Sequence, residues 1–160
     1  MQTGQVVVRD GRIKDIQKAL GIWHEFMDHH KRISALDNET VDDASGMWVH
    51  YFERHVRSPR RKAVIAEQDG DVIGFLLGEI QKRPPIFKTQ HQAFVDSIGV
   101  AESKRNQGIG GLMLDYFEKW AKQKGLPCVM LNVVVENANA IRFYATHGYR
   151  TMILSERKLL

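Results

Sequence analysis

The sequence VAESKRNQGIGGLML, from Val100 to Leu114, decides how we interpret the chain. An apolar strand pattern ends at Val100, a polar turn RNQGIG follows over 105–110, and an apolar helical pattern begins at Ile109. A turn between a strand and a helix N-terminus presents free backbone N–H groups and the positive end of the helix dipole to an anion. Gly108 and Gly110 carry no Cβ, so the backbone can approach a diphosphate closely. The stretch therefore predicts a phosphate-binding turn.

The spacing of this turn argues against two commoner phosphate motifs. The chain has no Gly-x-x-x-x-Gly-Lys-Ser/Thr segment, so a P-loop is unsupported. It also has no Gly-x-Gly-x-x-Gly after an early strand, so a dinucleotide-binding fingerprint is unsupported. What remains is an Arg-x-x-Gly-x-Gly turn, with Lys104 and Arg105 as cations at its rim. An ordinary Gly-rich turn between a strand and a helix is the alternative interpretation.

Length and composition bound the class of protein. A chain of 160 residues can bury a sizeable core, so we expect one domain over residues 1–160. No apolar run of about 18 residues occurs, so we expect no membrane span, and the apolar N-terminal stretch is too short for a signal peptide. The single cysteine, Cys128, excludes an internal disulfide and favours a cytoplasmic protein. The net charge of +4 is scattered except in RSPRRK, residues 57–62, which we interpret as a solvated connector and not as a nucleic-acid patch.

Hydrophobic periodicity predicts an α/β fold with a mixed sheet. Strands are predicted at Val6–Arg9, Lys62–Glu67, Val72–Gln81, Phe94–Val100, Cys128–Val134 and from Thr151 to Leu154. Helices are predicted over Lys14–Asp28, from Asp42 or Asp43 to Val56, over Ile109–Lys124 and over Asn139–His147. Residues 33–38 are expected to be irregular, and residues 82–92, which contain two prolines, are expected to form a loop. The order β-α-α-β-β-β-α-β-α-β predicts an antiparallel sheet that ends in a parallel pair around Cys128–Val134.

A second motif lies in VVVENANAIRFYATHGY, residues 133–149. It has the pattern Asn-x-x-Ala-x-x-x-Tyr-x-x-x-Gly-aromatic, carried by Asn137, Ala140, Tyr144, Gly148 and Tyr149. Together with the RNQGIG turn, this pattern resembles the GNAT N-acetyltransferase superfamily over about residues 62–149. The resemblance implies the GNAT-like acyl-CoA N-acyltransferase fold, with splayed central strands in a mixed sheet.

The resemblance also assigns residues to acetyl-CoA, the acyl donor. The turn would bind the pyrophosphate, and the backbone at the end of the strand before it would pair with the pantetheine arm. Asn137 could bond the pantetheine, cap the helix that follows it, or do both. Gly99 suggests a bulge or a close backbone approach. The residues so implied are Ile98, Gly99, Val100, Arg105, Asn106, Gln107, Gly108, Ile109, Gly110, Asn137 and Tyr144.

Acetyl transfer to an amine needs a proton for the departing thiolate and a base for the amine. The resemblance implies that Tyr144 is the general acid, and a core tyrosine is the alternative. Asp96 is the candidate base, and Ser97 beside it is expected to point to the opposite face of the strand. Glu79 on the neighbouring strand and His91 in the loop are the other candidate bases. A solvated acidic side chain is the alternative interpretation of Asp96.

The expected function is an N-acetyltransferase that transfers the acetyl group of acetyl-CoA to a primary amine by direct attack in a ternary complex. A non-catalytic acyl-CoA-binding module is the alternative. The acceptor is open. The acidic side chains of residues 37–43 could attract a polyamine, an aminoglycoside or a lysine, a solvated acidic loop is the favoured alternative, and a peptide N-terminus is equally compatible. Dimers are common among members, so a homodimer in which the tail ILSERKLL adds a strand across the interface is also open.

The histidines and the cysteine predict no further chemistry. His24 and His29 are five residues apart, as are His50 and His55, so neither pair shares a helix face, and we expect no metal. Cys128 lies in an apolar strand pattern, and we expect a buried structural cysteine and not an acyl-cysteine nucleophile. We expect no nucleic-acid or membrane partner.

Overall fold

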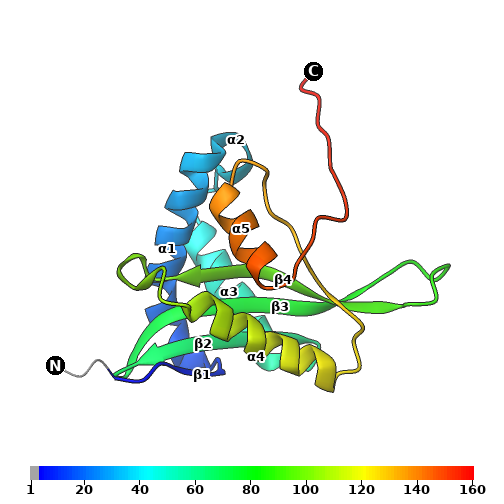
Figure 1. The fold of residues 1–160 in the computed structure, drawn as a ribbon. Coiled ribbons are helices and arrows are strands. Elements are labelled where there is room, and N and C mark those ends of the chain that lie inside the picture. The colour runs from blue at the N-terminus through cyan, green and yellow to red at the C-terminus, as the bar shows by residue number, and fades with distance from the viewer. Residues whose placement is uncertain (1–3) are drawn as a thin grey trace.

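The strands of the sheet follow the chain order, β1-β2-β3-β4-β5, in the computed structural model, which describes residues 4–160 (Figure 1). The strands are β1 (Val7–Asp10), β2 (Arg61–Gln68), β3 (Asp71–Lys82), β4 (His91–Val100) and β5 (Val129–Leu131). Strands β1 to β4 pair antiparallel, and β4 pairs with β5 in parallel. The predicted mixed sheet, antiparallel first and then parallel, is confirmed.

Helices cover both faces of this sheet (Figure 1). The helices are α1 (Ile16–Ile33), α2 (Ala35–Asn38), α3 (Ala44–Arg57), α4 (Ile109–Gln123) and α5 (Ala138–Thr146). Short 3₁₀ turns precede α1 at Ile13–Asp15 and α4 at Glu102–Lys104. Within residues 4–160, no helix is long and apolar enough to cross a membrane.

The sheet separates two apolar clusters, because alternate residues of each strand point to opposite faces. On one face, Met113 and Phe117 of α4 pack against β2, β3 and β4. On the other face, Trp23 of α1 and Phe52 of α3 pack against residues such as Phe75 of β3. The side chains packed under α4 and those packed under α1 and α3 therefore form two separate cores, one on each face of the sheet.

Strand β4 is irregular where it leaves β5. Its register with β3 slips between the pairs Leu77–Ser97 and Gly78–Val95, so Asp96 is an extra residue on β4, as in a β-bulge. Strand β5 pairs with β4 only at residues 93–95. Beyond the bulge, β4 keeps its pairing with β3 but has no strand partner on its other side within the described residues.

Several predicted boundaries of helices are wrong. Helix α1 continues to Ile33, past the predicted end at Asp28, and residues 35–38 form the short helix α2 instead of irregular chain. Asp43 occupies the N-cap of α3, but its side chain makes no capping hydrogen bond. The polar residues after Asp28 are compatible with a helix and include no helix breaker, so α1 continues past Asp28.

The C-terminal part of the chain differs most from its prediction. Strand β5 has three residues, none of them buried, because it lies at the sheet edge and pairs with only part of β4. Cys128, just before it, is exposed, so the expected buried cysteine is wrong. The predicted strand from Thr151 is not formed, and the tail at 151–160 is exposed along its length and extends away from the sheet (Figure 1). Arg157 of this tail pairs with Asp37 of α2.

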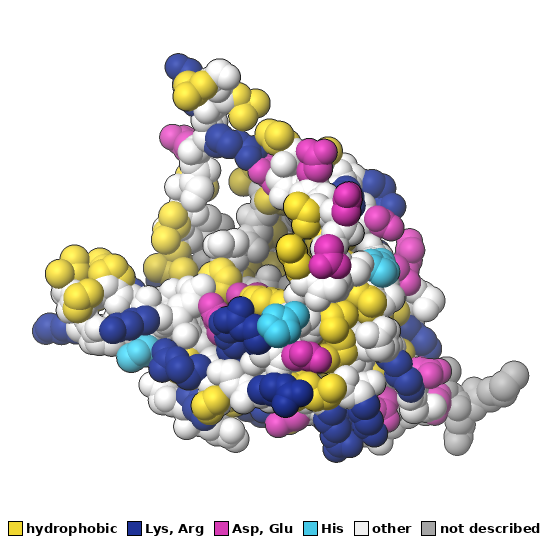
Figure 2. All heavy atoms as spheres, turned by 180° about the vertical axis from the view of Figure 1, so that it is seen from behind, with side chains coloured by type: hydrophobic (Ala, Val, Ile, Leu, Met, Phe, Trp, Pro, Cys, Tyr) yellow, Lys and Arg dark blue, Asp and Glu magenta, His cyan; other side chains and the backbone are white. Residues whose placement is uncertain are grey.

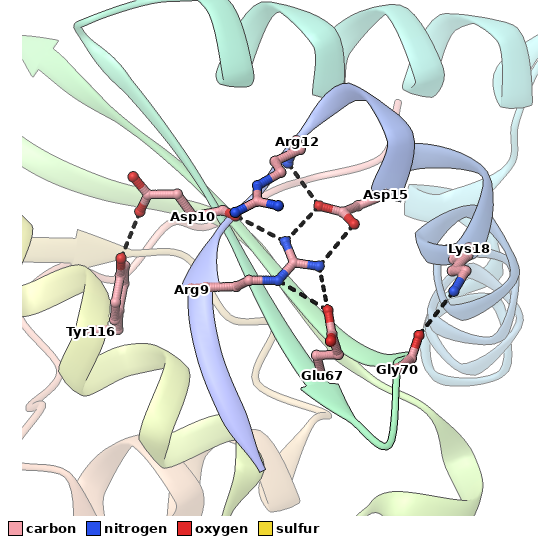
Figure 3. Close-up of polar contacts among 8 residues, drawn as sticks. All are labelled: Arg9, Asp10, Arg12, Asp15, Lys18, Glu67, Gly70 and Tyr116. Carbon is pink, nitrogen blue, oxygen red and sulfur yellow. Dashed lines mark hydrogen bonds and ion pairs between the residues drawn. The ribbon is translucent and has the colours of Figure 1, made fainter.

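An ion-pair network ties the start of the chain to the sheet (Figure 3). The Arg9 guanidinium of β1 donates two hydrogen bonds to the buried carboxylate of Asp15, with Nη1–Oδ2 at 2.7 Å and Nη2–Oδ1 at 2.9 Å. Its Nε donates to Glu67 of β2 at 3.0 Å. The Arg12 backbone N–H also donates to Asp15. These hydrogen bonds, led by those from Arg9, hold the pKa of Asp15 below its ordinary value.

Replacing Asp15 by Asn should lower the free energy of unfolding by about 2 kcal/mol at pH 7, because Arg9 then loses a charged, bidentate partner. The folded state lowers the pKa of Asp15, so its contribution is present above the ordinary value of 3.8 and is lost as the pH falls below it. Urea unfolding at pH 7 and at successively lower pH should show the gap between wild type and Asp15→Asn narrowing below pH 3.8. A gap that does not change with pH would contradict this assignment.

Gly78 provides a test of how α4 packs. A Cβ there would lie 2.5 Å from the Phe117 ring and 2.7 Å from the Phe94 carbonyl oxygen. Gly78→Ala should therefore cost about 2 kcal/mol of stability through overpacking. Gly21 of α1 is the control, since its Cβ position is open and Gly21→Ala should stabilise the helix by about 1 kcal/mol. Both values follow from urea unfolding, and two changes of the same sign would refute the packing argument.

Candidate active site

The predicted phosphate turn has a backbone suited to an anion. Asn106 has φ 61° and Gly108 has φ 78°, both in the left-handed region. Gly108 is the N-cap of α4, and no side chain of residues 4–160 caps that helix end. A Cβ on Gly108 would meet nothing within 4 Å, so glycine is needed there for its φ and not for space. The first N–H groups of α4 are therefore available to a ligand.

The two cations of the turn point to protein partners. Arg105 Nε donates to the carbonyl oxygen of Val100 at 3.1 Å, which fixes the end of β4 to the turn. Lys104 Nζ donates to Gln68 Oε1 at 2.8 Å. The anion-binding character of the turn thus rests first on its backbone and on the helix dipole.

The glycines that begin α4 make room for α5. A Cβ on Gly110 would lie 3.0 Å from the Phe143 ring, and one on Gly111 would lie 2.5 Å from His147 Nε2. The missing Cβ of Gly110 therefore allows α5 to pack closely, and its predicted close approach to a diphosphate stays a prediction. Similarly, Gly99 leaves room for the Phe75 ring of the core. The bulge that the sequence suggested at Gly99 lies instead at Asp96.

Helix α5 carries two of the predicted residues. The buried Asn137 caps it, because Oδ1 accepts a hydrogen bond from the Ala140 N–H at 3.1 Å. Tyr144 is half-buried beside Phe143 and Tyr149, on the α4 face of the sheet. Burial raises the pKa of Tyr144 to about 12. Its hydroxyl therefore carries a proton at neutral pH, as a general acid must.

Asp96 lies on the opposite face, where it meets α3. Its Oδ2 is 3.1 Å from Nε2 of the buried His55. Ser97 pairs with Leu77, whose side chain belongs to the cluster under α1 and α3, so Ser97 points to this same face. The expected opposite orientation of Ser97 is wrong, because the bulge interrupts the alternation of the strand.

Charged and polar side chains gather around Asp96. Glu79 of β3 pairs with Arg61 of β2, with Nε–Oε2 at 3.3 Å, and the Arg61 guanidinium lies 5.9 Å from the centre of the Tyr51 ring. Burial first, and then the charges of Asp96 and Glu79, raise the pKa of Tyr51 above its ordinary value. The structure thus brings two of the candidate bases together around Tyr51. His91 is not among them, since it pairs with Lys82 at the far end of the hairpin.

A cavity of about 440 Å³ adjoins this cluster. Its lining residues are Arg54, Arg57, Ser58, Arg60, Arg61, Glu79 and Ile80. Arg61 and Glu79 belong to both the cavity and the cluster, so the two are continuous. The segment that was predicted to be a solvated connector therefore supplies most of a cationic wall.

The contact of His55 with Asp96 was not predicted from the sequence, and Tyr51 was treated only as part of a core stripe that could line the acceptor side. His55 is 41 residues from Asp96, and only the folded sheet brings them together. A buried histidine on the apolar face of an amphipathic helix was the available signal. Within residues 4–160, no three His, Cys, Asp or Glu side chains could together hold a metal ion.

Comparison with known proteins gives one consistent family. Residues 23–149 match the profile of the Acetyltransferase (GNAT) family. The chain is 29% identical to N-alpha-acetyltransferase 60 of Xenopus tropicalis and 30% identical to an N-alpha-acetyltransferase of Sulfurisphaera tokodaii. These matches cover 71% and 63% of this chain but only 55% and 64% of the relatives.

The fold also matches a solved structure, that of the aminoglycoside N-acetyltransferase AAC(6')-Iy in complex with CoA. The TM-score is 0.76 at 16% identity, with 98% of this chain and 97% of the other covered. The match with the family profile contains both sequence motifs and confirms the family inferred from them.

The cap on α5 gives a test that needs no ligand. Asn137→Ala should lower the stability of α5 by about 1 kcal/mol, because the Ala140 N–H loses its acceptor. Hydrogen exchange of the α5 amides measures this loss locally. Asn139→Ala is the control, since that side chain bonds only Arg142 on the exposed surface of the same helix. Equal protection in the two variants would argue against a capping role.

Proposed function

The chain belongs to the GNAT family of acetyltransferases, and from this membership we propose that it transfers an acetyl group from acetyl-CoA to a primary amine. The thioester of acetyl-CoA supplies the activated acetyl group. The proposed binding residues are the RNQGIG turn for the pyrophosphate and the backbone of Ile98, Gly99 and Val100 for the pantetheine arm. The unpaired side of β4 beyond the bulge supports this assignment, because those backbone groups face no other strand among the described residues.

The proposed reaction is a direct attack of the amine on the thioester within a ternary complex. The amine nitrogen forms a bond to the acetyl carbon while the C–S bond breaks. Asp96 takes the proton that the amine loses, and the Tyr144 hydroxyl gives its proton to the departing thiolate. Solvent then restores the proton of Tyr144.

One observation carries this proposal: the two candidate groups belong to elements on either side of the point where β4 and β5 separate, Asp96 to β4 and Tyr144 to α5, which follows β5. Tyr144 is held in its protonated form by burial on the α4 face. Asp96 contacts α3 on the other face, at the residue where β4 leaves β5. A purely acyl-CoA-binding module would have no use for this arrangement.

The proposed acceptor is the α-amine of a peptide or amino acid. Two relatives are named N-alpha-acetyltransferases. The cavity beside Glu79 also favours this class, because its arginines would attract a carboxylate and repel a polyamine or an aminoglycoside. The acidic side chains of residues 37–43 give less support to a cationic acceptor, since Asp37 is already paired with Arg157.

The test is thiol release from acetyl-CoA with a panel of peptides, amino acids, polyamines and aminoglycosides. We expect turnover with a peptide or amino acid, and Tyr144→Phe should lower kcat by about a hundredfold or more. Tyr149→Phe is the matched control, because the Tyr149 hydroxyl bonds Glu118 and its loss should affect stability but not kcat. Binding of acetyl-CoA without turnover on any acceptor would favour the binding module. Turnover that is unchanged in Tyr144→Phe would refute its role as the acid.

A further inference from the structure

His55 is a fully buried, ionisable side chain that the proposed reaction does not use. It lies on the inner face of α3, and its side chain is 0% exposed. Both ring nitrogens are engaged. Nδ1 lies 2.8 Å from the Tyr51 carbonyl oxygen, and Nε2 lies 3.1 Å from Asp96 Oδ2.

The direction of these hydrogen bonds determines how many protons the pair holds. A carbonyl oxygen only accepts, so Nδ1 must carry a proton. The contact between Nε2 and Oδ2 also needs a proton, because two lone pairs would repel each other at 3.1 Å. A carboxylate that is to take the proton of the amine cannot already hold this one, so the proposed base role of Asp96 places the proton on Nε2 of His55. The proton therefore belongs to His55, which donates it to Asp96.

The surroundings are consistent with an imidazolium–carboxylate pair whose two charges cancel. The other charged groups of the cluster, Arg61 of β2 and Glu79 of β3, already pair with each other. Tyr51 stays protonated, because burial and the nearby carboxylates raise its pKa. The Asp96 side chain is only 16% exposed, and a carboxylate with so little contact with water needs a charged partner.

We propose that His55 is a positioning residue for the acetyl transfer: it donates Nε2–H to Asp96 Oδ2 and so holds the carboxylate in place to take the proton of the acceptor. This inference rests on the proposed role of Asp96 as the base. Asp96 is the extra residue of the bulge, so the ladder does not fix its orientation as it does for a regular strand residue. His55 supplies that constraint from α3 through its contact with Oδ2.

Two substitutions of His55 separate positioning from simple packing. His55→Gln keeps a side-chain N–H that can donate to Asp96, whereas His55→Leu fills similar space without a donor. We expect kcat to fall about a hundredfold in His55→Leu, since a base displaced by about 1 Å can cost that much, with the KM for acetyl-CoA unchanged. His55→Gln should recover most of kcat. The same two substitutions at His50 are the controls, because this side chain lies on the same helix and is 76% exposed. We expect neither His50 substitution to change kcat.

A second readout does not depend on activity. In protein labelled with ¹⁵N-histidine, the imidazole of His55 should show both nitrogens protonated at pH 7, and in Asp96→Asn it should become the neutral form with a proton on Nδ1 only. An unprotonated Nε2 in the wild type, or a His55→Leu variant that folds and keeps its kcat, would overturn the proposal. If wild type turns over no acceptor, the proposed function fails, and the NMR result still decides whether the proton lies between His55 and Asp96.

Discussion

The unequal pairing of β4 is the constraint on which the rest of this structure depends. On one side β4 pairs with β3 along its length, and on the other it pairs with β5 over three residues only. Asp96 is inserted at the point of separation, so the strand turns an extra side chain toward α3 as it loses its neighbour. One local irregularity thus frees backbone hydrogen-bonding groups and presents a carboxylate at the same place.

Packing on both faces of the sheet holds β4 against β3. Strand β4 therefore cannot shift toward β5 and extend their pairing. On the α4 face, Phe117 occupies the space that a Cβ at Gly78 would need, directly opposite the bulge. On the other face, the ring of Phe75 lies against Gly99 of β4. These contacts hold β4 to β3 through interlocking shapes, and interiors packed in this way deform little. The open side of β4 is therefore a rigid feature of the sheet.

Local sequence patterns predicted the elements well and the contacts between them poorly. Periodicity identified most of the strands and helices, and the left-handed residues of the RNQGIG turn lie where the glycine pattern indicated. The orientation of Ser97 was missed because alternation assumes an uninterrupted strand, and a bulge leaves no local signal. The exposure of Cys128 was missed because apolar residues at a sheet edge have the composition of a buried strand. The contact of His55 with Asp96 depends on tertiary packing alone.

The sheet separates the proposed acid from the proposed base. The proposed acid, Tyr144, belongs to the α4 face, and the proposed base, Asp96, belongs to the face of α1 and α3. Apolar clusters cover both faces of the sheet (Figure 2 shows the α1 and α3 side from outside). In the proposed reaction one substrate would meet both groups where β4 and β5 separate, so the unequal pairing of β4 bears on the proposed chemistry as well as on the fold.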